Sequence, residues 1–140
     1  MELRQSLHVA ARAKVPSFIR CVILLSLVRT LLRTRGFGPT LRVVRLCTAR
    51  LRVGNQVCTP DGVAQRVAAA AAFFPGRARC LEQSLVLLYL LRRFGRDARL
   101  RMGVQPFGFK AHAWVECDGQ AINERLETIR ALVAFPEILT

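Results

Sequence analysis

The hydrophobic period of this chain changes at Gly95, and that change restricts the possible folds more than any other feature. Between Cys80 and about Arg93 the leucines recur at helical spacing, and Phe94-Gly95 gives this segment a favourable helix end. In residues 98–104, A-R-L-R-M-G-V, apolar side chains instead alternate with a period of 2. The sequence therefore predicts a helix with one deeply buried face, followed by a half-buried strand.

Two further strands are predicted beyond this point. Residues 111–117, A-H-A-W-V-E-C, form the first of them, and Asp118-Gly119 is a hairpin turn into the other at 120–123. The tail from residue 125 onward predicts a loop and a short terminal helix. Together these elements indicate an α+β fold, in which the helix that begins at Cys80 packs on a small antiparallel sheet.

The N-terminal half of the chain is predicted to be helical. Residues 1–15 predict a short helix up to Pro16, and Ser17 is the expected N-cap of the next helix. The G-F-G-P run at residues 36–39 is expected to end that helix, and helical spacing resumes at Thr40. Apolar stripes of this kind are typical of core or interface faces.

A stronger helix start follows at Thr59-Pro60-Asp61. A capping hydroxyl, a proline at the first helical position and an acid near the positive end of the helix dipole coincide there. The alanine-rich residues 63–74 continue this helix until Pro75-Gly76 stops it. Because a chain of this length usually builds one hydrophobic core, we expect a single domain over residues 1–140, with 1–58 as a helical lead-in.

The chain has a formal net charge of +13, carried almost entirely by arginine, which predicts an acidic partner. The arginines are scattered rather than clustered among stacking aromatics, so nucleic acid is not the expected partner. The longest apolar run, residues 21–28, is shorter than the roughly 20 residues of a membrane span. A secretion signal is a minor alternative, since no small-residue cleavage site follows this run.

Cysteine spacing points to reduced thiols. The five cysteines form no C-x-x-C pair and follow no regular spacing, which argues against a disulfide framework or a zinc site. We therefore expect a cytoplasmic protein with no metal site. The cysteines are Cys21, Cys47, Cys58, Cys80 and Cys117.

Cys80 is the candidate nucleophile. It opens a helix and follows Arg77 and Arg79, and both helix N-terminal amides and nearby cations favour the reactive thiolate over the thiol. The competing interpretation is that Cys80 is a small buried hydrophobic residue, which is the commoner role of a free cysteine. The other four cysteines lack this setting and are interpreted as structural.

His112 is the candidate base. The only other histidine, His8, lies in the least organised part of the chain, whereas His112 lies in a predicted strand whose alternation puts Trp114 and Glu116 on the same face. A nucleophile with a nearby imidazole is the pattern of cysteine-based catalysis. A hydrogen-bonded structural histidine is the alternative.

The group that orients the imidazole depends on the hairpin register. If a three-residue loop places Gly119 in the left-handed conformation, His112 lies opposite Glu124. If Asp118-Gly119 is instead a two-residue turn, Asn123 lies on the histidine's face and Glu124 points away. Either side chain can accept a hydrogen bond from an imidazole, so the residues alone leave both open.

These motifs carry a family resemblance. C-L-E-Q-S-L-V-L-L-Y-L-L-R-R-F-G, then L-R-M-G-V, then F-K-A-H-A-W-V-E-C-D-G-Q-A-I-N-E resemble the transglutaminase-like leader peptidase of bacterial lasso-peptide biosynthesis. The resemblance is close over about residues 59–124. It implies a transglutaminase-like and papain-like core over 59–140, with Cys80 as nucleophile and His112 as base. The family usually has Asp at the position of Glu124, so the implied triad is one methylene longer.

The resemblance implies a cysteine peptidase that removes the leader from a ribosomally made precursor peptide through a thioester intermediate, without a cofactor. It also implies two protein partners in the bacterial cytoplasm: a small leader-recognition protein, because the chain is similar to the split form of the family, and a separate lasso cyclase. Two alternatives are a thiol acyltransferase of the same fold and a non-catalytic basic docking subunit.

Overall fold

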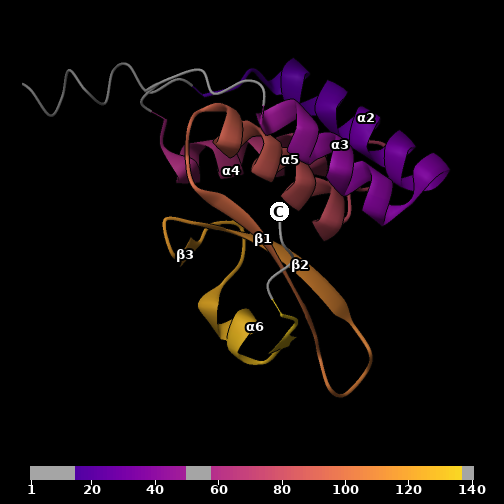
Figure 1. The fold of residues 1–140 in the computed structure, drawn as a ribbon, viewed down its shortest axis with the longest axis vertical. Helices are drawn as coiled ribbons and strands as arrows, with labels where there is room; N and C mark the ends of the chain where they lie inside the picture. Colours follow the sequence, from indigo (N-terminus) through magenta and orange to yellow (C-terminus); the bar gives the residue numbers. More distant parts are fainter. Residues whose placement is uncertain (1–14, 50–57, 137–140) are drawn as a thin grey trace, which may run out of the picture.

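The computed structural model describes residues 15–49 and 58–136, and Figure 1 shows their arrangement. The helix expected at residues 1–15 therefore falls almost entirely outside the described residues. In chain order the elements are α2 (Phe18–Arg35), α3 (Phe37–Ala49), α4 (Pro60–Ala72), α5 (Cys80–Arg93), β1 (Ala98–Val104), β2 (Ala111–Cys117), β3 (Gln120–Ala121), α6 (Leu126–Arg130) and β4 (Val133–Ala134).

The predicted helix starts are confirmed in α2 and α4, except that the Thr59 hydroxyl forms no capping hydrogen bond. The break predicted between α2 and α3 is longer than the one observed. The Ser17 hydroxyl caps α2 by accepting a hydrogen bond of 3.3 Å from the N–H of Arg20. Only Gly36 interrupts the helices, with a φ of +81°, and Gly38 and Pro39 already belong to the first turn of α3. Proline is accommodated there because the N–H groups of a first turn have no partner within the helix.

Helix α5 is the centre of the molecule. It contacts α2, α3, α4, β1 and β2, so that helices cover most of its circumference and the sheet covers the remainder (Figure 1). The sequence pattern predicted one deeply buried face, whereas the structure buries nearly the whole helix after its first turn. Its leucines and Val86 are buried because they meet a neighbour on every side; the fully buried members are Leu85, Val86, Leu87, Leu88, Leu90 and Leu91.

The antiparallel sheet has the order β3-β2-β1-β4. Strand β2 pairs with β1 along its whole length, from Ala111 opposite Val104 to Cys117 opposite Ala98. On its other edge β3 covers only Glu116 and Cys117. The third strand, expected over 120–123, thus ends two residues early, and β4 is an addition that the sequence did not predict.

The two faces of the sheet have different coverings. Ala113, Val115 and Cys117 of β2 belong to the core shared with the helices. Trp114 is outside that core and yet only 1% exposed. A Cβ on Gly103 would come within 3.3 Å of the Trp114 ring and within 3.1 Å of Leu132, so glycine permits the C-terminal segment to close over the tryptophan. Trp114 therefore fills a second small core.

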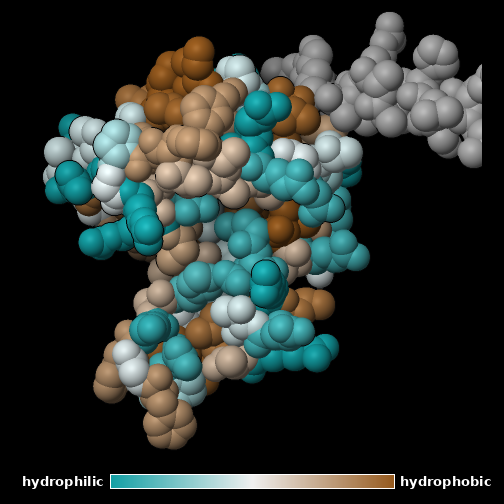
Figure 2. All heavy atoms as spheres, turned by 180° about the vertical axis from the view of Figure 1, so that it is seen from behind, coloured by the Kyte–Doolittle hydropathy of each residue, from teal (hydrophilic) through white to brown (hydrophobic). Residues whose placement is uncertain are grey.

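The outer surface of the helical layer is apolar and basic. Ile19, Ile23 and Leu27 lie four residues apart on α2 and are 70%, 54% and 55% exposed. Figure 2 shows apolar surface at the top of the helical layer. Residues 18–49 contain six arginines and no acidic residue. None of the described helices is both long and apolar enough to cross a membrane.

Candidate active site

Cys80 is the first residue of α5, as the sequence predicted. The residue before it, Arg79, has an extended backbone and serves as the N-cap. Cys80 is half-buried against the core, and no described residue forms a hydrogen bond with its Sγ atom. The thiol thus lies beside the free amide groups of a helix N-terminus, where negative charge is stabilised.

Arg29 of α2 holds the loop that leads into Cys80. Its guanidinium forms two 3.0 Å hydrogen bonds with the carboxylate of Glu82, through Nε and Nη2. It also donates to the backbone carbonyls of Pro75 at 2.7 Å and Arg77 at 2.8 Å, and it lies 4.4 Å from the ring centre of Phe74. One side chain of the N-terminal helices therefore fixes the path of residues 74–79.

Glu82 completes this support from within α5. Its Oε2 atom accepts a 2.8 Å hydrogen bond from the backbone N–H of Arg79, which is half of a capping box. Burial alone would raise the pKa of Glu82, but the hydrogen bonds from Arg29 and from the Arg79 N–H hold it below its ordinary value of 4.5. Glu82 is therefore a carboxylate at neutral pH and remains available to bind the guanidinium.

A chain of neutral hydrogen bonds joins α5 to the open edge of β2. The Ser84 hydroxyl donates to the carbonyl of Ala113 at 3.0 Å, and the Asn123 amide group donates to Ser84 Oγ at 3.0 Å. The Asn123 Oδ1 atom in turn accepts from the N–H of Val115 at 2.8 Å. Because Ser84 lies one helical turn after Cys80, and Ala113 directly follows His112, these hydrogen bonds fix the helix that begins with Cys80 against the strand that carries His112.

His112 is paired with Glu124. The imidazole Nε2 atom contacts the Glu124 Oε2 atom directly, and both side chains are partly buried. The other carboxylate oxygen, Oε1, accepts a 2.9 Å hydrogen bond from the N–H of Arg125. Burial alone would raise the pKa of Glu124, but the Arg125 N–H, His112 and the Thr128 hydroxyl together hold it below its ordinary value of 4.5. Glu124 is thus an ionised acceptor for the imidazole.

The observed hairpin register contradicts our prediction of which side chain meets His112. Asp118 and Gly119 form a two-residue turn, both with positive φ (+53° and +81°), and Cys117 pairs with Gln120. We expected this register to bring Asn123 to the histidine and to turn Glu124 away. The opposite is found, because the chain leaves the ladder after Ala121 and strand alternation no longer governs residues 123 and 124.

Sequence reasoning missed three supporting groups. Arg29 gave no local signal, since its partners lie 46 to 53 residues away. Ser84 did give one, because it is a hydroxyl in a run of leucines on a buried helix. Glu82, three residues after the N-cap, fits the acidic half of a capping box.

The other cysteines differ from Cys80 in setting. All five thiols are free. Burial, followed by the nearby Asp118 carboxylate, raises the pKa of Cys117 to about 11, and burial also raises the pKa of Cys21. Cys58 is buried and Cys47 is exposed on α3. Cys117 and Cys21 are consequently held as neutral thiols in the core.

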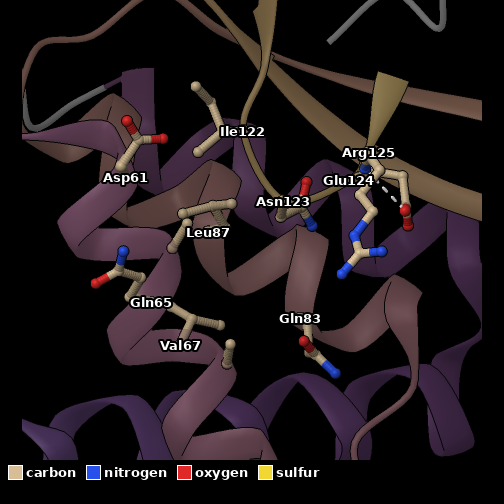
Figure 3. Close-up of a pocket in the computed structure, with 11 residues that line it drawn as sticks. Asp61, Gln65, Val67, Gln83, Leu87, Ile122, Asn123, Glu124 and Arg125 are labelled. Carbon is tan, nitrogen blue, oxygen red and sulfur yellow. Dashed lines mark hydrogen bonds between the residues drawn. The ribbon is translucent and has the colours of Figure 1, made fainter. Parts of the chain in front are cut away.

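A groove of about 810 Å³ opens beside the site, between α4, α5 and residues 122–125 (Figure 3). Gln83 and Leu87 line it from α5, and Asn123 and Glu124 bring it to the His112 side of the site. In the described part of the chain, no three histidine, cysteine, aspartate or glutamate side chains come together as metal ligands.

A helix that begins with a cysteine and packs on an antiparallel sheet carrying a histidine is an arrangement suited to thiol-based acyl chemistry. Residues 24–136 match the family model of the Transglutaminase-like superfamily, and the chain therefore belongs to that superfamily. This family generally has the fold of cysteine peptidases and acyltransferases, and the match confirms the predicted fold class. No curated protein and no solved structure matches the chain. The narrower resemblance to leader peptidases stays a prediction.

Proposed function

We propose that this protein is a cysteine peptidase that removes the leader from a ribosomally made lasso precursor peptide. The observation that carries the proposal is the direct contact between His112 and an ionised Glu124, next to a helix that opens with Cys80. A carboxylate that accepts from one imidazole nitrogen fixes the tautomer and leaves the other nitrogen facing away from it, available to a nucleophile.

In the proposed reaction His112 takes the proton of the Cys80 thiol, and the resulting thiolate attacks the carbonyl carbon of the leader's last residue. Backbone N–H groups in the first turn of α5 stabilise the oxyanion that forms. His112 then protonates the departing amine, which becomes the new N-terminus of the core peptide, and a thioester remains on Cys80. Water, deprotonated by His112, attacks the thioester, releases the leader as a carboxylic acid and restores the thiol.

The hydrogen bond from Ser84 of α5 to the edge of β2 supports the pairing of Cys80 with His112. His112 and Trp114 lie on the sheet face away from the helical core, whereas Ser84 bonds to the carbonyl of Ala113 at the uncovered edge of β2. Cys80 lies four residues before Ser84, and His112 lies one residue before Ala113, so both are close in sequence to this hydrogen bond.

The outer face of α2 and α3 supports partner binding. Its exposed isoleucines and leucine stand among arginines without any acid, which suits an acidic partner with an apolar contact patch. We assign this face to the leader-recognition protein, with the lasso cyclase acting afterwards on the released core, and we place the reaction in the bacterial cytoplasm, where the five free thiols stay reduced. The same face is the observation that favours the second candidate function, a non-catalytic docking subunit.

Incubation of the protein with its cognate precursor peptide and the leader-recognition protein, followed by mass spectrometry, tests the proposal. We expect cleavage at the leader–core junction, and a loss of about 10³-fold or more in rate for Cys80→Ala and for His112→Ala. Cys58→Ala is the matched control, because Cys58 is a thiol outside both the candidate site and the α2–α3 face assigned to the partner, and it should cut at about the wild-type rate.

Three outcomes separate the candidates. Cleavage that persists in Cys80→Ala would refute the proposal. An inert wild type that still binds the leader-recognition protein would establish the docking subunit instead. A product whose mass shows an added amine in place of water would establish a thiol acyltransferase.

A further inference from the structure

We propose that the groove beside the site binds an acidic side chain of the peptide substrate, and that Arg125 is the residue that selects it. The inference rests on the proposed function, because it assigns to the same site a preference within its peptide substrate. The groove has the volume of a ligand-binding cleft and is lined both by apolar and by hydrogen-bonding side chains.

The groove begins at Gln83, three residues after the candidate nucleophile Cys80, which does not itself line it. Cys80, Gln83 and Leu87 are spaced three and four residues apart, so they share one face of α5. Gln83 and Leu87 line the groove, and Gln83 is fixed there by a 2.9 Å hydrogen bond from its Nε2 atom to the carbonyl of Ala78. A peptide whose scissile bond lies at Cys80 therefore has one flank in the groove.

The floor of the groove is apolar and built from small residues. Ala64, Val67 and Ala68 of α4 face Leu87 of α5, and Val67 and Leu87 are only 2% and 1% exposed. Small side chains on a helix leave room for a backbone to approach closely. The floor thus accepts the backbone of a peptide. Charged or polar side chains of that peptide must turn toward the rim of the groove.

Arg125 supplies the charge at the rim. Figure 3 shows its side chain extending toward Gln83, at the part of the groove nearest the start of α5. The residue is exposed, and no described residue forms a hydrogen bond or ion pair with its guanidinium. Its backbone is engaged instead, because the N–H donates to Glu124 and the carbonyl accepts from the N–H of Ile129. A planar guanidinium with free donors binds a carboxylate through two parallel hydrogen bonds.

The two carboxylates of the groove do not neutralise this charge. Glu124 already accepts from His112 and from the Arg125 N–H, and its side chain turns away from the groove in Figure 3. Asp61 stands on α4, across the groove from Arg125 (Figure 3). The end nearest Cys80 therefore attracts negative charge, as does the protein as a whole with its net charge of +13.

The test uses peptides that span the leader–core junction of the cognate precursor. Each residue of the peptide is replaced in turn by Glu and by Gln, so that members of a pair differ in charge and hardly in shape. Peptide binding is measured by fluorescence anisotropy. The Cys80→Ala protein is compared with the same protein carrying Arg125→Gln or Arg125→Glu. Arg130→Gln and Arg130→Glu are matched controls, because Arg130 is an exposed arginine on α6 that does not line the groove.

We expect one position at which the Glu peptide binds about tenfold more tightly than its Gln partner. Arg125→Gln should abolish this preference and Arg125→Glu should reverse it, while both Arg130 variants should retain it. The variants at position 125 keep the backbone N–H that Glu124 uses, and their melting temperatures should match the parent protein.

Each outcome decides the inference. A preference for Glu that survives Arg125→Glu, the absence of any Glu-over-Gln preference, or the absence of peptide binding would overturn it. Wild-type cleavage without a charge preference would leave the peptidase standing and remove only the role of Arg125. Arg125-dependent binding to a protein that cuts no peptide would support the groove and refute the proposed peptidase.

Discussion

The first two turns of α5 are held from two sides by different kinds of bond. On one side Arg29 and Glu82 form a bidentate ion pair, with side chains 14% and 10% exposed. On the other side Ser84 and Asn123 form neutral hydrogen bonds to the edge of β2, and Ser84 is completely buried. The first support comes from the N-terminal helices, and the second lies within the segment that carries the candidate site.

The two supports therefore have different structural roles. The attraction between two opposite charges decreases slowly with distance, so an ion pair tolerates small shifts. It therefore suits a loop that must be held in place. Neutral hydrogen bonds weaken steeply when distance and angle change, so they suit a contact that fixes the position of the Cys80 helix relative to the His112 strand. Four changes, described from the largest expected effect to the smallest, test this division.

Asn123→Ala should have the largest effect. It leaves the buried N–H of Val115 without its acceptor and Ser84 without its donor, so we expect a loss of about 1–3 kcal/mol in the free energy of unfolding. We also expect about a 100-fold loss in kcat, since a small misplacement of catalytic groups costs that much. Urea denaturation and precursor cleavage measure the two effects. Gln120→Ala, at an exposed position of the same hairpin, is the control, and equal effects of both variants would contradict the assigned role.

Glu82→Gln should have a smaller effect on activity and a clear effect on the loop before Cys80. Loss of the carboxylate removes the bidentate pair with Arg29, so we expect a lower melting temperature and faster amide hydrogen exchange in residues 75–80. Glu116→Gln is the matched control, because Glu116 forms a looser pair with Arg101 at 3.7 Å. Unchanged exchange in residues 75–80 would show that the Arg29–Glu82 pair does not hold this loop.

Acid should weaken the ionic support and leave the neutral one intact. The pKa values of Glu82 and Glu124 are both lowered, so the unfolded chain binds more protons than the folded protein as the pH falls below about 4.5. The stability that these carboxylates contribute is present above that pH and is lost as the pH drops through their lowered pKa values. Melting temperatures of wild type and Glu82→Gln should converge in acid. A melting-temperature difference between the two proteins that stays constant from neutral pH into acid would contradict a lowered pKa of Glu82 in the folded protein.

Salt should have the smallest effect. Screening shortens the reach of charge to about 3 Å at 1 M ionic strength, although partly buried pairs are screened less. We expect the melting-temperature difference between wild type and Glu82→Gln to shrink in concentrated NaCl, and the difference between wild type and Asn123→Ala to stay constant. Differential scanning fluorimetry over a salt series measures both. An equal response of the two variants would show that the supports do not differ in kind.

The same contrast explains what could be predicted from the sequence. Periodicity located α5 and β1 to the residue, because long stretches of one period are strong signals. The turn at Asp118-Gly119 was also predictable, since its chemistry is local. The early end of β3 was not, because it depends on where residues 122–124 meet α5. The role of Arg29 was equally unpredictable. Tertiary packing decides which of the six arginines on α2 and α3 pairs with Glu82.

The candidate site shows the same limit. Cys80, His112 and Glu124 were chosen as candidates from residue type and from a family resemblance, and their catalytic roles remain proposals. Two hairpin registers were possible, and the two-residue turn that is observed brings Glu124 to His112 rather than Asn123, which strand alternation predicted. Strand alternation fails as a guide once a strand has ended, and nothing in the local sequence marks that end.

The short β3 has a further consequence for how the protein avoids self-association. An uncovered row of backbone N–H and C=O groups is a template on which a strand of another molecule can pair, and it is a common route to aggregation. At the edge of β2 the side chains of Asn123 and Ser84, with the N–H of Ile122, occupy the bonding positions of Val115 and Ala113. A foreign strand would find no regular ladder to extend there. The edge of β2 is thus a poor seed for a growing sheet.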